Sequence, residues 1–271
     1  MNAFNIHNLT LNISMKPSRK FEDLVELVAI LRKECPWDRK QTHESIKDNL
    51  IEEAYEAIEA LDDKDFDEFK KEIGDLLLHV LFHSEMASET ETFDIGDVIY
   101  TLMEKLIRRH PHVFGDTVVD GEEQVSENWE NIKLKEGKKS TLDGLPSQLP
   151  SLIRAQRMQE KAANVGFDWP EWKLALEKLD EELQEFRQAL ENGNKNELAD
   201  EFGDVLFSMV NVSRYFELNA EDSLRKTNAK FEHRFRYIEK KLNEQGKALK
   251  DSTLEEMDAY WNEAKQHHKD E

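Results

Sequence analysis

Two stretches of the sequence repeat one pattern of acidic residues, E-E-x-x-E followed by E-x-x-D. The pattern comprises Glu52, Glu53, Glu56, Glu72 and Asp75 in the first half and Glu181, Glu182, Glu185, Glu201 and Asp204 in the second. In both copies the glutamate of E-x-x-D lies 19 positions after the second glutamate of the cluster, and a glycine precedes the aspartate. An internal repeat with matching offsets predicts two related domains.

Each acidic cluster lies on a segment with the apolar periodicity of an amphipathic helix. Apolar residues recur at i, i+3, i+4 and i+7, as in Ile51, Ala54, Tyr55 and Ile58. Short polar segments, "LDDKDFDEF" and "LENGNKNEL", separate the two acidic helices of each half, so we expect each pair to form an antiparallel αα-hairpin. Only 10 Gly and 6 Pro are available for the turns of a sheet protein, and we predict an all-α fold.

The Gly, Pro and Ser residues of "KEGKKSTLDGLPSQLPSL" predict a linker between two helical halves. We expect a flexible leader at residues 1–20, a first helical domain at 21–137, a linker at 138–150 and a second helical domain at 151–271.

Charge and cysteine content limit the partners and the compartment. The formal net charge of -21 argues against a nucleic-acid or membrane-surface binder, because those partners are polyanionic. No apolar stretch is long enough to span a membrane, and the first residues lack the apolar core of a signal peptide. The single cysteine, Cys35, cannot form an intrachain disulfide. We expect a cytoplasmic protein with no nucleic-acid or membrane partner.

The repeated carboxylates predict a metal site. On a helix Glu53 and Glu56 share a face, and such like charges destabilise the helix unless a cation neutralises them. A ligand set of carboxylates selects a hard cation, Mg²⁺ with Mn²⁺ as a possible substitute, over zinc. The alternative is a solvated acidic surface, because 58 of the 271 residues are acidic. Two copies with the same offsets favour a metal site in at least one half.

The acidic pattern resembles the signature of the all-α nucleoside triphosphate pyrophosphohydrolases, and its tandem arrangement resembles the MazG-type members. Further stretches agree in the same order, namely "CPWDRKQTHESI", "RRHPHVFGD", "RAQRMQEKAANVGFDWP" and "NAKFEHRFRYIEK". The resemblance covers nearly everything after residue 20. It implies two tandem MazG-type helical bundle domains, a homodimer, and Mg²⁺-dependent hydrolysis of ribo- and deoxyribonucleoside triphosphates to nucleoside monophosphate and pyrophosphate.

The resemblance also implies site residues in the second half. Its catalytic metal ligands correspond to Glu182, Glu185, Glu201 and Asp204. Its nucleotide-binding positions correspond to Lys178, Glu181, Asp200, Asn211, Lys230, Arg234, Trp261 and Lys265. Some of these residues also have plain structural readings: Lys230 and Arg234 as surface ion-pair partners, Trp261 as a core residue, and Asn211 as a satisfied core amide.

The first half keeps the four carboxylates of a possible second metal site, Glu53, Glu56, Glu72 and Asp75. It differs nearby, where Asn49, Lys71 and Phe82 stand in place of Lys178, Asp200 and Asn211. We therefore expect the second half to be the main catalyst and the first half to scaffold or regulate the protein.

Two alternative functions stay open at this point. Instead of hydrolysing nucleoside triphosphates generally, the chain could be a non-enzymatic helical interaction or regulatory protein that retains acidic faces, or a pyrophosphohydrolase for a narrower damaged or signalling nucleotide. His79 and His83 have the i, i+4 spacing of some zinc sites, but without the glutamate of H-E-x-x-H we interpret them as part of a packed face.

Overall fold

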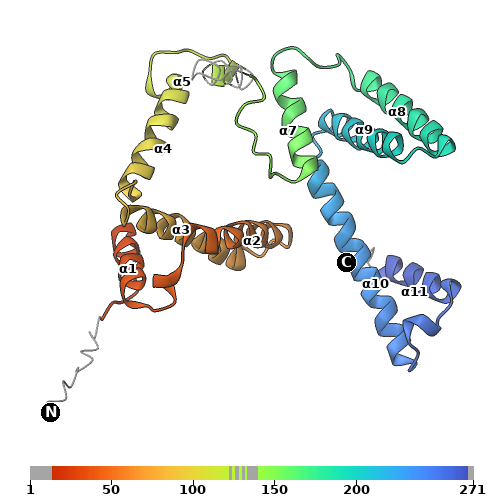
Figure 1. Cartoon of the computed structure of the whole chain (residues 1–271), viewed down its shortest axis with the longest axis horizontal. Helices are drawn as coiled ribbons and strands as arrows, with labels where there is room; N and C mark the ends of the chain where they lie inside the picture. Colours follow the sequence, from red (N-terminus) through yellow and green to blue (C-terminus); the bar gives the residue numbers. More distant parts are fainter. Residues whose placement is uncertain (1–13, 122–123, 126–127, 130–131, 133–139, 268–271) are drawn as a thin grey trace. The chain divides into compact units, whose positions relative to one another are not determined.

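The computed structural model describes residues 14–121, 124–125, 128–129, 132 and 140–267. These residues form helices and connecting segments without a strand, so the all-α prediction is confirmed for this part of the chain (Figure 1). Most of the expected leader, residues 1–13, lies outside the described residues, as do residues 138–139 of the expected linker. The chain divides into two compact units, Met1–Val118 and Val119–Glu271.

The first unit is built around the antiparallel hairpin of α2 (His43–Asp62) and α3 (Phe66–Ser88) (Figure 1). Thr42 and Ser45 form a capping box at the start of α2, and the Asp65 side chain accepts from the first amides of α3. The unit also contains α1 (Phe21–Glu34), the short 3-10 helix η1 (Asp38–Lys40), α4 (Ile95–Arg109) and α5 (Pro111–Phe114). Helix α1 packs against α3.

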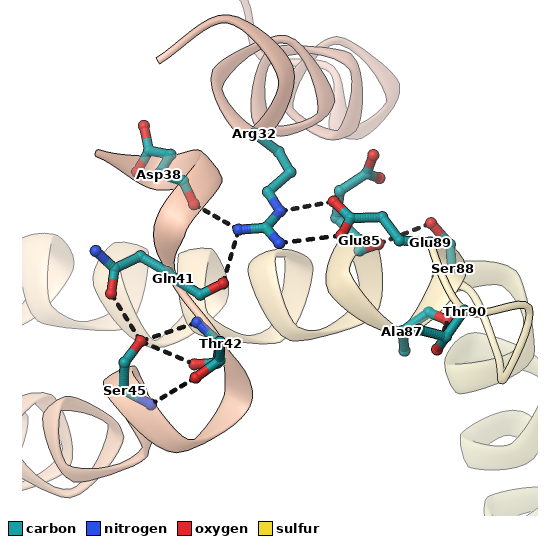
Figure 2. A network of polar contacts seen from close by, with 10 residues as sticks. All are labelled: Arg32, Asp38, Gln41, Thr42, Ser45, Glu85, Ala87, Ser88, Glu89 and Thr90. Atoms are coloured by element: carbon teal, nitrogen blue, oxygen red, sulfur yellow. Dashed lines mark hydrogen bonds and ion pairs between the residues drawn. The ribbon is translucent and has the colours of Figure 1, made fainter. Parts of the chain in front are cut away.

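Arg32 joins α1 to the segment before α2 and to the end of α3. Its guanidinium forms an ion pair with Glu89, with Nε 2.6 Å from Oε1, and donates to the carbonyl oxygens of Asp38 and Gln41 (Figure 2). The apolar core of this unit comprises Val28, Ile46, Leu81, Phe82 and Met86. Arg32 therefore links α1 to the segment before α2 and to Glu89, which follows α3, through charge-assisted hydrogen bonds.

The second unit repeats the hairpin with α8 (Trp172–Asn192) and α9 (Lys195–Arg214). Gly193 ends α8 in the left-handed conformation, with φ of +68°, and the Asn194 side chain accepts from the Asn196 amide at the start of α9. These two residues make a turn short enough to bring the acidic faces of α8 and α9 together.

The second unit also contains α7 (Ser151–Ala163), α10 (Ala220–Glu244) and α11 (Leu254–His267), with the short η2 (Leu249–Asp251) before α11. Helix α7 packs against α9 and α10, and α10 packs against α11. None of the helices in the described residues is long and apolar enough to cross a membrane.

Both hairpins also expose apolar side chains. On the second hairpin those at least 43% exposed are Leu190, Phe202, Leu206, Phe207 and Met209. Some of the apolar residues that follow the helical periodicity are therefore exposed and not part of the core of a single chain.

Candidate metal and nucleotide site

Three carboxylates converge across the second hairpin. Glu182 and Glu185 on α8 and Glu201 on α9 each place a carboxylate oxygen within 4.8 Å of the others. Glu182 is 6% exposed, while Glu185 is exposed and Glu201 half-buried. The group therefore combines a buried wall with an open side, as a site for a cation and its ligand requires.

Local packing explains why the carboxylates meet. Glu182 and Glu185 are three residues apart and share a face of α8. Leu179 and Ala189 bury apolar positions of the same helix, and the Phe186 and Phe202 rings contact across the hairpin with centroids 5.9 Å apart. The apolar contacts hold two helices whose acidic faces would otherwise repel each other.

Lys178 partly offsets this repulsion. Its Nζ lies 2.8 Å from Glu181 Oε1 and 2.8 Å from Glu182 Oε1. The hydrogen bonds to Glu181 and Glu182 raise the pKa of the Lys178 ammonium. On α9 the charged form is instead disfavoured, because burial and the charges of Glu185 and Asp204 raise the pKa of Glu201.

The remaining predicted residues on the hairpin lie around the group. Asp204 is one turn after Glu201 and close enough to influence its pKa, but it is not one of the three converging carboxylates. Asp200 is an exposed residue of α9. Asn211, two turns beyond Asp204, accepts a hydrogen bond at Oδ1 from Arg214 Nη1 at 2.8 Å.

The other predicted nucleotide-binding residues lie on the α10–α11 pair, not on the carboxylate hairpin. The Arg234 guanidinium lies over the Trp261 ring, 5.3 Å from its centroid, and the Phe231 ring packs against the same indole. Lys230 and Lys265 are exposed. The structure thus gathers the predicted residues into two groups, one acidic and one basic and aromatic.

The first unit has a matching acidic group. Glu53, Glu56 and Glu72 also place carboxylate oxygens within 4.8 Å of one another. Burial and the neighbouring charges of Glu56 and Glu53 raise the pKa of Glu72 to about 7, and burial together with Asp75 raises the pKa of Glu53. Either acidic group is compatible with a divalent cation.

Around its acidic group the first unit differs as the sequence indicates. Lys71 forms an ion pair with Glu68 on its own helix. Phe82 is buried in the core, with the Arg32 guanidinium 6.0 Å from the centre of its ring. At the matching place in the second unit the polar Asn211 lies against a cavity.

Sequence reasoning assigned no role to the segment between α7 and α8. Its Asp168 accepts from Arg214 Nη2 at 2.6 Å and from the Tyr215 hydroxyl at 2.9 Å. Burial raises the pKa of Asp168, but hydrogen bonds from Arg214 and Tyr215 outweigh it and keep that pKa below its ordinary value. The stretch "ANVGFDWP" is part of the family resemblance, but the sequence does not indicate that Asp168 binds Arg214 and Tyr215.

The packed-face interpretation of His79 and His83 concerns the first unit. His83 Nδ1 lies 2.8 Å from His43 Nδ1, and the two rings are stacked. His79 stacks on His83 with centroids 6.2 Å apart. The three rings pack together along one side of α3.

Comparison with known proteins agrees with these two acidic hairpins. Residues 41–114 and 172–238 match the family model described as the MazG nucleotide pyrophosphohydrolase domain. The chain is 48% identical to the nucleoside triphosphate pyrophosphohydrolase/pyrophosphatase MazG of Thermotoga maritima over 250 residues, which cover 90% of this chain and 95% of that protein. It is 41% identical to the nucleoside triphosphate pyrophosphohydrolase of Escherichia coli K12 over 239 residues, covering 85% of this chain and 90% of that relative. The two matched segments each contain one acidic hairpin, which confirms the tandem arrangement.

Proposed function

The chain belongs to the MazG nucleotide pyrophosphohydrolase family, and we propose that it hydrolyses ribo- and deoxyribonucleoside triphosphates to nucleoside monophosphate and pyrophosphate with Mg²⁺. The observation that carries the proposal is the convergence of Glu182, Glu185 and Glu201 across one hairpin. The main catalyst is the second helical domain, residues 151–271, and the domain at residues 21–137 scaffolds or regulates it.

The donor set fits a hard divalent cation, because the three converging groups are carboxylates. Glu182, Glu185 and Glu201 would hold the ion, with Asp204 as a fourth carboxylate on α9. When bound, Mg²⁺ neutralises charge on the phosphate oxygens and activates water for attack on phosphorus. Mn²⁺ has similar ligand preferences and is the expected substitute.

The chain's own residues keep this site ready for a cation. Lys178 holds the buried Glu182 carboxylate in place and adds a positive charge at the edge where phosphates would arrive. Burial and the charges of Glu185 and Asp204 raise the pKa of Glu201, which supports a site where neighbouring carboxylates repel one another. A cation relieves this repulsion, so metal binding and hairpin stability support each other.

The basic and aromatic group on α10 and α11 suits the triphosphate and its nucleoside. The Arg234 guanidinium lies over the Trp261 ring, and its Nε is buried and has no hydrogen-bond partner among the described residues. A planar, oriented guanidinium is suited to bidentate contact with phosphate oxygens. Lys230, one turn earlier on α10, and Lys265 on α11 add positive charge to this group.

We also infer a cytoplasmic homodimer. Apolar side chains exposed on α9, among them Phe202, Leu206 and Met209, give a surface that a second copy would cover. The net charge of -21 disfavours nucleic acid and anionic membranes as partners.

The test compares matching positions in the two halves of the intact chain. Pyrophosphate release is measured with Mg²⁺ and a panel of nucleoside triphosphates for the wild type, Glu182→Gln and Glu53→Gln. We expect Glu182→Gln to lower kcat by about 100-fold or more, since it removes a ligand charge, and Glu53→Gln to retain most turnover. Equal losses in both variants, or a loss only in Glu53→Gln, would contradict the assignment of catalysis to the second half.

A further inference from the structure

Helices α10 and α11 lie side by side (Figure 1), and three polar side chains join them. The Tyr237 hydroxyl on α10 donates to Glu263 Oε1 on α11 at 2.6 Å. Lys241 Nζ, one turn further along α10, lies 3.2 Å from the same oxygen and 5.2 Å from the centre of the Tyr237 ring. Tyr237, Lys241 and Glu263 thus form a closed cluster, which we call the clamp.

The clamp is built from charge-assisted contacts. Its acceptor is a carboxylate, and hydrogen bonds to an ionised group are shorter and stronger than those between neutral groups. The hydrogen bond to Glu263 raises the pKa of the Tyr237 hydroxyl, so this group stays protonated and able to donate. The side chains of Lys241 and Glu263 are 31% and 40% exposed, so water screens their ion pair. The tyrosine hydrogen bond is therefore the main directional link between the two helices.

Apolar packing alone does not fix the position of α11 along α10. Ile238 and Leu242 of α10 and Ala264 of α11 are buried. The hydrophobic effect is non-directional, so it tolerates a small sliding or rotation of one helix against the other. The clamp residues are neighbours of these buried residues in the sequence, and their hydrogen bonds require a defined distance and angle. The clamp therefore selects one position of α11.

The clamp lies beside the basic and aromatic group. Tyr237 follows Arg234 by three residues on α10, and Glu263 follows Trp261 by two residues on α11. A displacement of Glu263 therefore carries Trp261 with it. The Arg234 guanidinium lies 5.3 Å from the centre of the Trp261 ring, and a cation–π contact extends to about 6 Å. A shift of α11 by about 1 Å is thus enough to weaken the contact.

We propose that Glu263 is a positioning residue, which holds Trp261 against Arg234 and so prepares this group to bind the nucleotide. Tyr237 and Lys241 act through Glu263. The proposal rests on the proposed function for the identity of the ligand. The placement of Trp261 by the clamp does not depend on the reaction and is measured without substrate.

The same two helices offer a matched control. Gln245 Nε2, at the end of α10, donates to the Tyr260 hydroxyl on α11. Gln245 follows Arg234 by eleven residues, on the order of 16 Å along the helix. Tyr237→Phe and Tyr260→Phe each remove one hydroxyl that links α10 to α11, but only Tyr237→Phe removes it from the clamp.

Fluorine-19 NMR of the full chain labelled with 5-fluorotryptophan tests the clamp without nucleotide or metal. The Trp261 resonance is assigned by its absence in Trp261→Phe. We expect it to shift and broaden in Tyr237→Phe and to stay in place in Tyr260→Phe. Glu263→Gln keeps an acceptor for the tyrosine hydroxyl and should change the resonance less than Tyr237→Phe does. A Trp261 resonance that is unchanged in Tyr237→Phe, or that moves equally in Tyr260→Phe, overturns the proposal.

Pyrophosphate release with Mg²⁺ tests whether the clamp serves the nucleotide. We expect Tyr237→Phe to raise KM for nucleoside triphosphates about fivefold with kcat nearly unchanged, because the clamp acts on binding residues and not on the carboxylates. Tyr260→Phe should leave both constants unchanged. An unchanged KM in Tyr237→Phe overturns the proposal. If the wild type releases no pyrophosphate but the Trp261 resonance responds as expected, the reaction is wrong and the positioning role of Glu263 stands.

Discussion

Replacing Glu72 with glutamine should reduce the proton release that accompanies Mg²⁺ binding by the chain. Glu72 is buried against Glu53 and Glu56, and burial and these charges raise its pKa to about 7. A carboxyl with this pKa is half protonated at pH 7, yet a carboxylate must be ionised to bind a metal ion. Binding by the first unit therefore expels a proton from a fraction of the molecules.

The magnitude follows from the pKa. For each ion bound by the first unit, Glu72 alone should release about 0.9 proton at pH 6, about 0.5 at pH 7 and about 0.1 at pH 8. The raised pKa of Glu53 adds to the release at the acid end. Isothermal titration calorimetry in two buffers with different ionisation enthalpies, at each pH, gives the number of protons directly.

The comparison of the wild type with Glu72→Gln isolates the first unit, because the carboxylates of the second unit are unchanged. We expect the difference in proton release to fall steeply from pH 6 to pH 8. A release that does not vary with pH, or that is the same in Glu72→Gln, would refute the reasoning that the first unit holds a protonated carboxyl which a cation displaces.

Three further predictions concern other residues. Lys178→Asn, which copies the residue of the first half, should lower kcat/KM by about 10- to 100-fold, because it removes the charge-assisted contacts to Glu181 and Glu182; the pyrophosphate assay measures this. Phe82→Ala should lower the free energy of unfolding of the first unit by about 3–5 kcal/mol in urea titrations while the folded chain keeps its kcat. In chelator, the pKa of Glu72 is about 7 in the folded chain, above its ordinary 4.5. The protonated Glu72 carboxyl therefore stabilises the folded chain fully below pH 4.5, and this stabilisation is lost as the pH rises through about 7. Melting temperatures of the wild type should therefore fall over this range more than those of Glu72→Gln.

The helices and hairpins were predictable because their signals are local. The i, i+3, i+4 and i+7 spacing of Ile51, Ala54, Tyr55 and Ile58 defines a helix face without any knowledge of its partner. Short polar turns such as 193–194 then leave an antiparallel hairpin as the simple connection. The family resemblance, confirmed by the comparisons, added the reaction class.

The details of the site depended on tertiary packing that the sequence does not encode locally. Spacing places Glu201 and Asp204 on one face of α9, but it does not show that Glu201 is the α9 residue whose carboxylate converges with Glu182 and Glu185. Likewise, Glu263 has the appearance of an ordinary polar helix residue in "WNEAK". Its contacts with Tyr237 and Lys241 become visible only when α11 packs on α10.

The central claim is that the carboxylates of the second hairpin support Mg²⁺-dependent cleavage of a nucleoside triphosphate to monophosphate and pyrophosphate. Phosphorus-31 NMR of the products formed by the wild type and by Glu182→Gln, with Mg²⁺ and with chelator, tests it most directly. The account predicts nucleoside monophosphate and pyrophosphate from the wild type only when Mg²⁺ is present, and almost none from Glu182→Gln. Nucleoside diphosphate and inorganic phosphate as the products, or equal turnover by Glu182→Gln, would contradict it.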